Sequence, residues 1–229
     1  MILSLGEKTV SPEEWQFDFS FPESAGQPNP HLWPDPNLGL RYAELVHDQL
    51  VGMDPDNSAY YRDNLERFRA RIEKMDQAIR TAVATVPESN RKLLTYHDSW
   101  AYFATQYGME VIGAVQPSNF SQPSVRDVAA LINQVKELAL PAVFGSEVFS
   151  SDVLESIASD AGVRFVDDLA DDDLPGKPGD QAHTYFGLMK QNMTIMIPAL
   201  GGDVSLSLIH ISEPTRRYAI SYAVFCMKK

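Results

Sequence analysis

The chain has 229 residues, of which 44% are hydrophobic and 22% charged, a composition typical of a globular protein with a buried core. Its formal net charge of −12 argues against a nucleic-acid ligand, because phosphate binding requires clustered Lys and Arg. A single cysteine, Cys226, excludes an internal disulfide framework and any metal site with several thiolates.

The first third of the chain predicts irregular backbone followed by two helices. Residues 1–36 are rich in Pro and aromatic residues and predict irregular backbone that lies on the surface. A first helix is predicted over 36–51, and a long amphipathic helix over 55–84. Leu65, Phe68 and Ile72 lie on the apolar stripe of the long helix.

After Pro87, short apolar runs alternate with helical patterns. Strands are predicted at 92–97, 110–115, 142–147 and 163–167, and helices at 99–107, 124–139, 150–161 and 181–200. This alternation is typical of βαβ units, and hence of a mainly parallel sheet with helices on both faces. The sequence therefore predicts an α/β fold in which residues 88–203 form one compact lobe.

Three histidines lie at the boundaries of predicted elements. His31 sits between prolines in NPHLWPDP, His97 ends a strand, and His183 begins the last helix. Ligands of parallel sheets bind at the C-terminal ends of strands, which makes His97 a candidate site residue. Three histidines far apart in sequence suit a metal site assembled by the fold, and three unrelated surface histidines are the alternative. His47, on the polar face of the first helix, is predicted to be solvated surface.

Motifs for other chemistry are missing from the sequence. It contains no HExxH, CxxC, GxSxG, Walker or GxGxxG pattern, which leaves a serine hydrolase or a nucleotide-binding protein without support. The acidic run at 167–180 is interpreted as a solvated loop that attracts cations only at long range. The start MILSLGEKTV has no basic region and no cleavage site, which taken literally predicts a cytoplasmic protein.

The C-terminal stretch breaks the pattern. LSLIHISEPTRRYAISYAVFCMKK has neither a helical nor an alternating period, and it resembles translated sequencing-adapter sequence. We expect residues 205–229 to be a non-native tail, with a genuine β-hairpin as the alternative. His210 and Cys226 are therefore excluded from the candidate site.

Five motifs together resemble a known family. They are NPHLWPDPNLGLRYAELVHDQL, MDPDNSAYYRDNLERF, LLTYHDSWAYFATQYGMEVIG, VFGSEVFSSDVLESIASDAGVRFVDDL and HTYFGLMKQN. The chain resembles the metal-specific solute-binding proteins of bacterial ABC importers for zinc and manganese, from about Lys8 to Asp203. Asn29 stands where the first motif of the family has Asp, and His183 stands at the usual Asp of the last.

The resemblance implies two α/β lobes bridged by one long helix, with metal in the cleft between them. Residues 1–54 would be a remnant of the N-terminal lobe, 55–86 the long bridging helix and 88–203 the C-terminal lobe. The chain would then be truncated at its N-terminus, and one further metal ligand would be absent. We expect part of the apolar stripe at Leu65, Phe68 and Ile72 to have lost its cover.

The resemblance also implies site residues. His31, His97 and His183 fall on metal-ligand positions. Glu147 takes the place of a recurrent glutamate, which either supports the metal ligands from behind or has a role that the resemblance leaves open. Asp98 either orients the site or caps the following helix. Three imidazoles favour Zn²⁺, with Mn²⁺ as the alternative.

The function implied by the resemblance is capture of a divalent metal for an ABC importer permease. The full-length protein would be a non-enzymatic monomer, periplasmic or lipid-anchored, with its export signal absent from this fragment. Two alternatives stay open. One is a zinc-dependent hydrolase with a His₃ site, and the other is a metal-independent adhesion or interaction domain.

Overall fold

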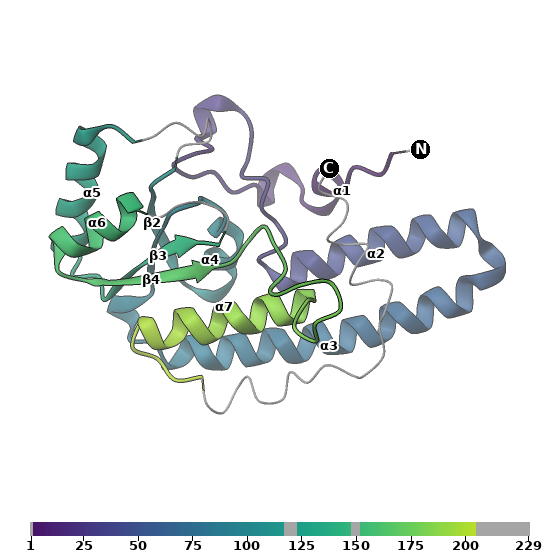
Figure 1. Ribbon diagram of the computed structural model, residues 1–229. Helices are drawn as coiled ribbons and strands as arrows, with labels where there is room; N and C mark the ends of the chain where they lie inside the picture. The colour runs from purple at the N-terminus through teal and green to yellow at the C-terminus, as the bar shows by residue number, and fades with distance from the viewer. Residues whose placement is uncertain (1, 117–122, 148–151, 205–229) are drawn as a thin grey trace.

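The computed structural model describes residues 2–116, 123–147 and 152–204, so the predicted tail at 205–229 lies outside the described residues. The helices are α1 (Leu5–Thr9), α2 (Pro36–Met53), α3 (Ser58–Thr85), α4 (Ala101–Tyr107), α5 (Val125–Glu137), α6 (Asp152–Ala161) and α7 (Tyr185–Ala199) (Figure 1). The strands are β1 (Lys92–Thr95), β2 (Glu110–Ala114), β3 (Ala142–Ser146) and β4 (Arg164–Leu169). All of the predicted strands are present, with ends that differ from the predicted ones by at most two residues.

The four strands form one parallel sheet in the order β2-β1-β3-β4. Successive residues of a strand point to opposite faces, so Leu93 packs into the cluster with α3, α4 and α7, while Leu94 packs with α5 and α6. Both faces of the sheet are therefore covered by helices, which confirms the predicted α/β class. The chain leaves β1 toward β2 and then crosses to β3, so the strand order reverses between β1 and β3.

Helices α2 and α3 form a hairpin, and α7 lies along α3 (Figure 1). Leu65, Phe68 and Ile72 are only 7%, 6% and 1% exposed, so the expectation that their stripe has lost its cover is wrong. The physical reason is that α2 and α7 bury it, and the ring of Phe68 meets that of Phe186 on α7 edge-on. The 28 residues of α3 span about 42 Å at 1.5 Å per residue.

The N-terminal segment is more ordered than its composition predicts. Leu5 of the short helix α1 and Val10 pack with Tyr42 of α2 and Tyr102 of α4 in a third apolar cluster. Further along, Asp35 accepts the backbone N–H of Asn37 at 2.9 Å and so caps α2, which begins with a proline that has no N–H to satisfy. This cap fixes where the segment that carries His31 enters the helix.

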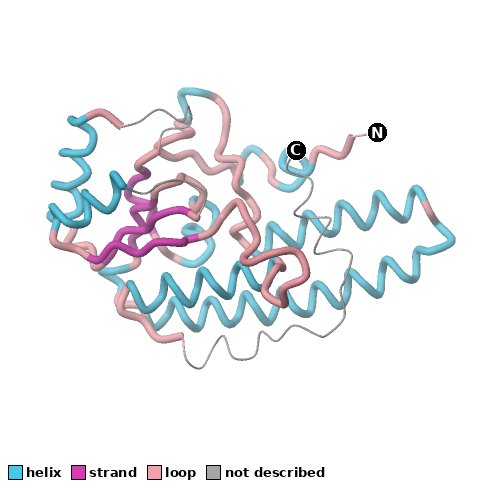
Figure 2. Tube along the Cα trace, viewed as in Figure 1, coloured by secondary structure: helices cyan, strands magenta, loops and turns pink. Residues whose placement is uncertain are grey.

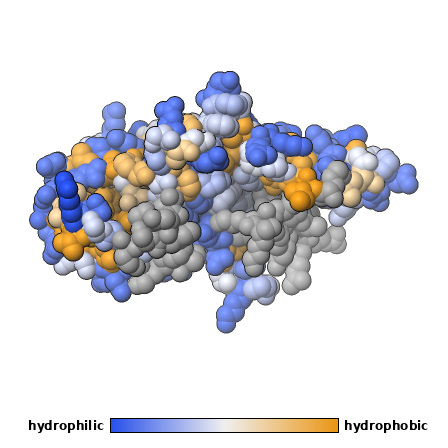
Figure 3. All heavy atoms as spheres, turned by 90° about the horizontal axis from the view of Figure 1, so that it is seen from above, coloured by the Kyte–Doolittle hydropathy of each residue, from blue (hydrophilic) through white to orange (hydrophobic). Residues whose placement is uncertain are grey.

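Loops gather at the C-terminal ends of the strands, beside the N-terminal segment (Figure 2). Seen from above, hydrophilic side chains cover most of the visible surface, with apolar side chains in scattered patches (Figure 3). None of the helices in the described ranges combines the length and the apolar character needed to cross a membrane.

Candidate metal centre

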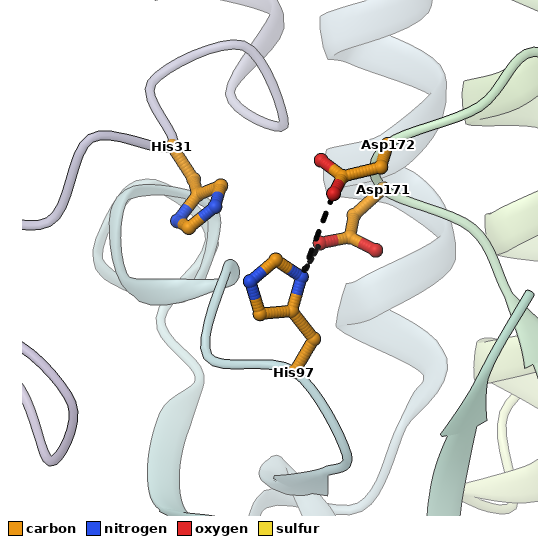
Figure 4. A group of neighbouring side chains, drawn as sticks. All are labelled: His31, His97, Asp171 and Asp172. Carbon is orange, nitrogen blue, oxygen red and sulfur yellow. Dashed lines mark ion pairs between the residues drawn. The ribbon is translucent and has the colours of Figure 1, made fainter. Parts of the chain in front are cut away.

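Two histidines and two aspartates meet at the C-terminal edge of the sheet. His31, His97, Asp171 and Asp172 each offer one ligand atom, and these atoms all lie within 4.8 Å of one another (Figure 4). They come from three segments: the N-terminal loop, the turn after β1 and the loop after β4. In open parallel sheets, ligands bind at this edge where the strand order reverses, as it does between β1 and β3.

His31 is held from behind by an asparagine. Its ring nitrogen Nδ1 lies 2.7 Å from Oδ1 of Asn29, and the same oxygen accepts the backbone N–H of His31 at 2.8 Å. The ring is buried between the edges of Phe21 and Trp33 and stands nearly perpendicular to the ring of His97, at 4.7 Å between centroids.

His97 lies two residues beyond the end of β1, and the last residue of the strand holds its backbone. The hydroxyl of Thr95 donates to the carbonyl of His97 at 2.7 Å. The ring nitrogen Nδ1 of His97 lies 2.7 Å from Oδ2 of Asp171 and 4.0 Å from Oδ2 of Asp172. A tetrahedral zinc bound by Nδ1 of His97 and Oδ2 of Asp171 would hold these two atoms roughly 3.3 Å apart. Metal entry between them therefore replaces a direct His97–Asp171 contact.

Glu147 holds the loop that carries the two aspartates. Its Oε1 accepts the consecutive backbone N–H groups of Asp171, Asp172 and Asp173 at 3.0, 2.9 and 3.0 Å. Three N–H groups that converge on one carboxylate oxygen fix the conformation of the loop. Glu147 does not belong to the group of four, and a role in orienting the metal ligands stays a prediction.

Two further side chains tie the same loop to the rest of the molecule. Asn192 on α7 clamps Ala170: its Oδ1 accepts the backbone N–H at 2.9 Å and its Nδ2 donates to the carbonyl at 2.6 Å. The indole N–H of Trp33 donates to the carbonyl of Asp171 at 2.7 Å, and the hydroxyl of Tyr185 donates to the carbonyl of Trp33 at 2.7 Å. The segments of His31 and Asp171 are thus joined directly.

The electrostatics of the loop place negative charge where a cation would sit. Burial alone would raise the pKa of Asp171, but the hydrogen bond and positive charge of His97 outweigh burial and hold that pKa below its ordinary value. The pKa of Glu147 is raised, first by burial and then by the charge of Asp171. The two neighbouring carboxyl groups thus have pKa values shifted in opposite directions.

The structure brings together two of the three predicted histidines. His31 and His97 belong to the group, whereas His183 does not: its Nδ1 lies 3.3 Å from the carbonyl oxygen of Pro175, in the loop before α7. The ligand role of His183 stays a prediction. Asp171 and Asp172 were missed, because the acidic run was interpreted as solvated, yet Asp171 is only 3% exposed.

Asp98 does not cap the helix that follows it. Helix α4 has Trp100 at its N-cap, without a side-chain hydrogen bond there, and Asp98 Oδ2 instead accepts the backbone N–H of Ser20 at 2.8 Å. The carboxylate thereby ties the N-terminal segment to the turn of His97. Of the two predicted roles, the geometry favours the supporting one.

Known proteins resemble this chain along most of its length. A family model described as "Zinc-uptake complex component A periplasmic" matches residues 4–199. The manganese-binding lipoprotein MntA of Halalkalibacterium halodurans is 28% identical over 172 residues, which cover 75% of this chain and 57% of that protein. The high-affinity zinc uptake system protein ZnuA of Bacillus subtilis is 27% identical over 172 residues, which cover 75% and 53%.

A solved structure shows the same fold. The periplasmic zinc-binding protein TroA of Treponema pallidum matches with a TM-score of 0.77 at 24% identity, covering 86% of this chain and 71% of that one. The chain spans about half the length of the curated relatives it matches. The family that matches consists of non-enzymatic substrate-binding proteins, so the zinc-hydrolase alternative has no support. This chain belongs to the ZnuA family of substrate-binding proteins of metal ABC transporters.

Proposed function

We propose that the protein captures a divalent transition metal outside the cytoplasm, zinc in preference to manganese, and delivers it to an ABC importer permease. The observation that carries this proposal is the group of His31, His97, Asp171 and Asp172, whose ligand atoms lie within 4.8 Å of one another. In this proposal the ion is cargo, and the histidines and aspartates are its ligands.

The donor set supports zinc but differs from the predicted three imidazoles. Two imidazoles with two carboxylates offer both nitrogen and oxygen, a combination that zinc accepts. A site of given nitrogen and oxygen ligands binds Zn²⁺ more tightly than Mn²⁺ by the general order of divalent-metal affinities. The carboxylates move the site toward the oxygen-rich sets that suit manganese, and one relative is named as a manganese-binding protein. Manganese therefore stays the alternative cargo.

The exposure of the ligands supports a cargo site rather than a closed structural one. His31 and Asp171 are 6% and 3% exposed, whereas the side chains of His97 and Asp172 are 14% and 24% exposed. A closed structural zinc site surrounds its ion with protein ligands, whereas a site with accessible ligands lets water or another donor complete the coordination. We infer that the ion enters and leaves past Asp172.

The remaining parts of the proposal extend to the full-length protein. We propose the division into a remnant lobe at 1–54, a bridging helix at 55–86 and a C-terminal lobe at 88–203. We also propose a monomer, periplasmic or lipid-anchored outside the cell, with His183 as a further ligand. This location is supported by similar proteins that are named as lipoproteins or as a periplasmic protein.

Competition titration against a chromophoric chelator tests the proposal. The chain is titrated with Zn²⁺ and with Mn²⁺, beside Asp171→Asn and the control Asp160→Asn, which changes an exposed carboxylate on α6. We expect one zinc per chain, weaker manganese binding, a loss of at least tenfold in zinc affinity for Asp171→Asn, and wild-type affinity for Asp160→Asn. Equal affinities of the two variants, or binding of neither metal, would contradict the proposal.

A further inference from the structure

Asn29 lies behind the metal ligand His31 and is completely buried, at 0% exposure. Its Oδ1 accepts two hydrogen bonds from His31, one from the backbone N–H at 2.8 Å and one from ring Nδ1 at 2.7 Å. Its Nδ2 donates to the carbonyl of Asp98 at 2.8 Å and to the carboxylate of Asp18. All four hydrogen-bonding positions of the amide are therefore occupied.

This environment allows only one orientation of the amide. The carbonyl of Asp98 can only accept, so the NH₂ group must face it, and the backbone N–H of His31 can only donate, so Oδ1 must face His31. Because an amide oxygen only accepts, Nδ1 of His31 carries the proton when the ring is neutral. The lone pair then resides on Nε2, and Nε2 is the atom that His31 can offer to a metal.

A carboxylate at position 29 could not make the same contacts. It has no N–H, so its second oxygen would face the carboxylate of Asp18 and the carbonyl of Asp98. The motif around His31 otherwise follows a pattern that has Asp at this position.

We propose that Asn29 is a positioning residue for metal binding, which sets the tautomer of His31 and fastens it to the turn of His97. The fastening runs through the carbonyl of Asp98, the residue next to His97. Two ligands from segments far apart in the sequence thus keep a fixed spacing before metal arrives. This inference rests on the proposed metal-binding function.

The first arm of the test measures the tautomer of His31 without metal. Nitrogen-15 NMR of histidine-labelled protein distinguishes a ring protonated on Nδ1 from one protonated on Nε2. We expect the Nδ1-protonated form in the wild type and in the control Asn57→Ala, which changes an exposed asparagine. We expect a mixture of tautomers in Asn29→Ala, since the acceptor is gone. An unchanged tautomer in folded Asn29→Ala would overturn the role of Asn29.

The second arm measures zinc affinity in a charge exchange. Asn29→Asp keeps an acceptor for His31 but loses both donors, and we expect a 10–100-fold loss of affinity, the usual range for a residue that orients a metal ligand. Asp18→Asn combined with Asn29→Asp restores a donor–acceptor pair. We expect the double variant to recover at least a third of the loss in the logarithm of the zinc affinity. No loss in the single variant, or no recovery in the double, would overturn the proposal.

The two arms separate this inference from the proposed function. A wild-type chain that binds no zinc would defeat the proposed function, while the tautomer, recorded without metal, would still decide the role of Asn29. Circular dichroism checks that each variant folds. Should Asn29→Ala fail to fold, the comparison of Asn29→Asp with the double variant decides.

Discussion

Oε1 of Glu147 accepts the backbone N–H of Asp171 at 3.0 Å, so the residue after β3 fixes the ligand loop after β4. The same oxygen accepts the N–H groups of Asp172 and Asp173. The loop is held by its backbone, so the side chains of Asp171 and Asp172 are not needed to fix it. Glu147 thereby helps to determine where two candidate ligands lie without belonging to the group of four.

Replacing Glu147 should weaken zinc binding strongly when the hydrogen-bond acceptor is removed and only slightly when an acceptor oxygen is kept. Glu147→Ala removes the acceptor for three N–H groups, and we expect zinc affinity to fall 10–100-fold, as for other residues that orient metal ligands. Glu147→Gln keeps a side-chain oxygen at the same place, so its affinity should stay within about tenfold of the wild type. Isothermal titration with zinc measures both. An alanine variant that binds as tightly as the glutamine variant would contradict this role.

Asn192 should contribute to stability through the backbone it clamps. Asn192→Ala leaves the buried N–H and carbonyl of Ala170 without their partner, which costs about 1–3 kcal/mol of unfolding free energy. Thr194→Ala, an exposed change on the same helix, should stay within about 0.5 kcal/mol of the wild type. Urea unfolding of both variants checks the difference. Equal midpoints would show that the clamp is not needed.

Gly39 should resist a substitution that normally stabilises a helix. Alanine in place of glycine in a helix gains about 1 kcal/mol, but a Cβ at Gly39 would lie 2.9 Å from the hydroxyl oxygen of Tyr185. We expect Gly39→Ala to lower the melting temperature of the wild type, and to lower that of Tyr185→Phe by less, since the closest atom is then removed. Gly52→Ala, on the same helix in open space, is the control and should not destabilise. A stabilised Gly39→Ala would contradict the predicted clash.

The stability of the metal-free protein should depend on the titration of Asp18. Burial, and then the neighbouring carboxylate of Asp98, raise the pKa of Asp18 from 3.8 to about 7. The charge of Asp18 in turn contributes to raising the pKa of the Tyr102 phenol. Between pH 3.8 and about 7 the folded protein binds more protons than the unfolded chain. The contribution of Asp18 to the unfolding free energy therefore falls as the pH rises through this window.

Asp18→Asn isolates this dependence. Relative to the wild type, the variant should gain stability as pH rises from 4.5 to 8, because the amide carries no charge to bury. Asp160→Asn, an exposed change, should run parallel to the wild type. Chemical unfolding across this pH range gives the comparison, and a constant difference between wild type and Asp18→Asn would refute the predicted titration.

The sheet was predictable because its signals are local. Short apolar runs bounded by Gly and Pro predicted all four strands, and their alternation with helices predicted that the sheet is parallel. The cover of α3 was not predictable in this way. The apolar stripe of a helix shows that it is buried, but not by which partner, and here α2 and α7 both contribute.

Half of the candidate site followed from the sequence. His31 and His97 were found because histidine at an element boundary is a distinct signal. Asp171 was hidden in an acidic run, where composition cannot separate a buried carboxylate from solvated ones. Its place two residues beyond β4 was the available signal, because the same argument from strand ends that selected His97 applies to it. His183 was selected because it is a histidine, and distance from the strand ends received less weight in that choice.

Calorimetric zinc titration of the chain beside His97→Ala and His47→Ala tests the central claim most directly. His47 lies on α2, outside the group of four, and its Nδ1 pairs with Asp48 at 2.9 Å. We predict that His97→Ala loses most of the zinc affinity and that His47→Ala keeps it; His183→Ala, run alongside, decides whether that residue is a ligand. Equal zinc affinities of His97→Ala and His47→Ala would contradict a metal centre at the C-terminal edge of this sheet.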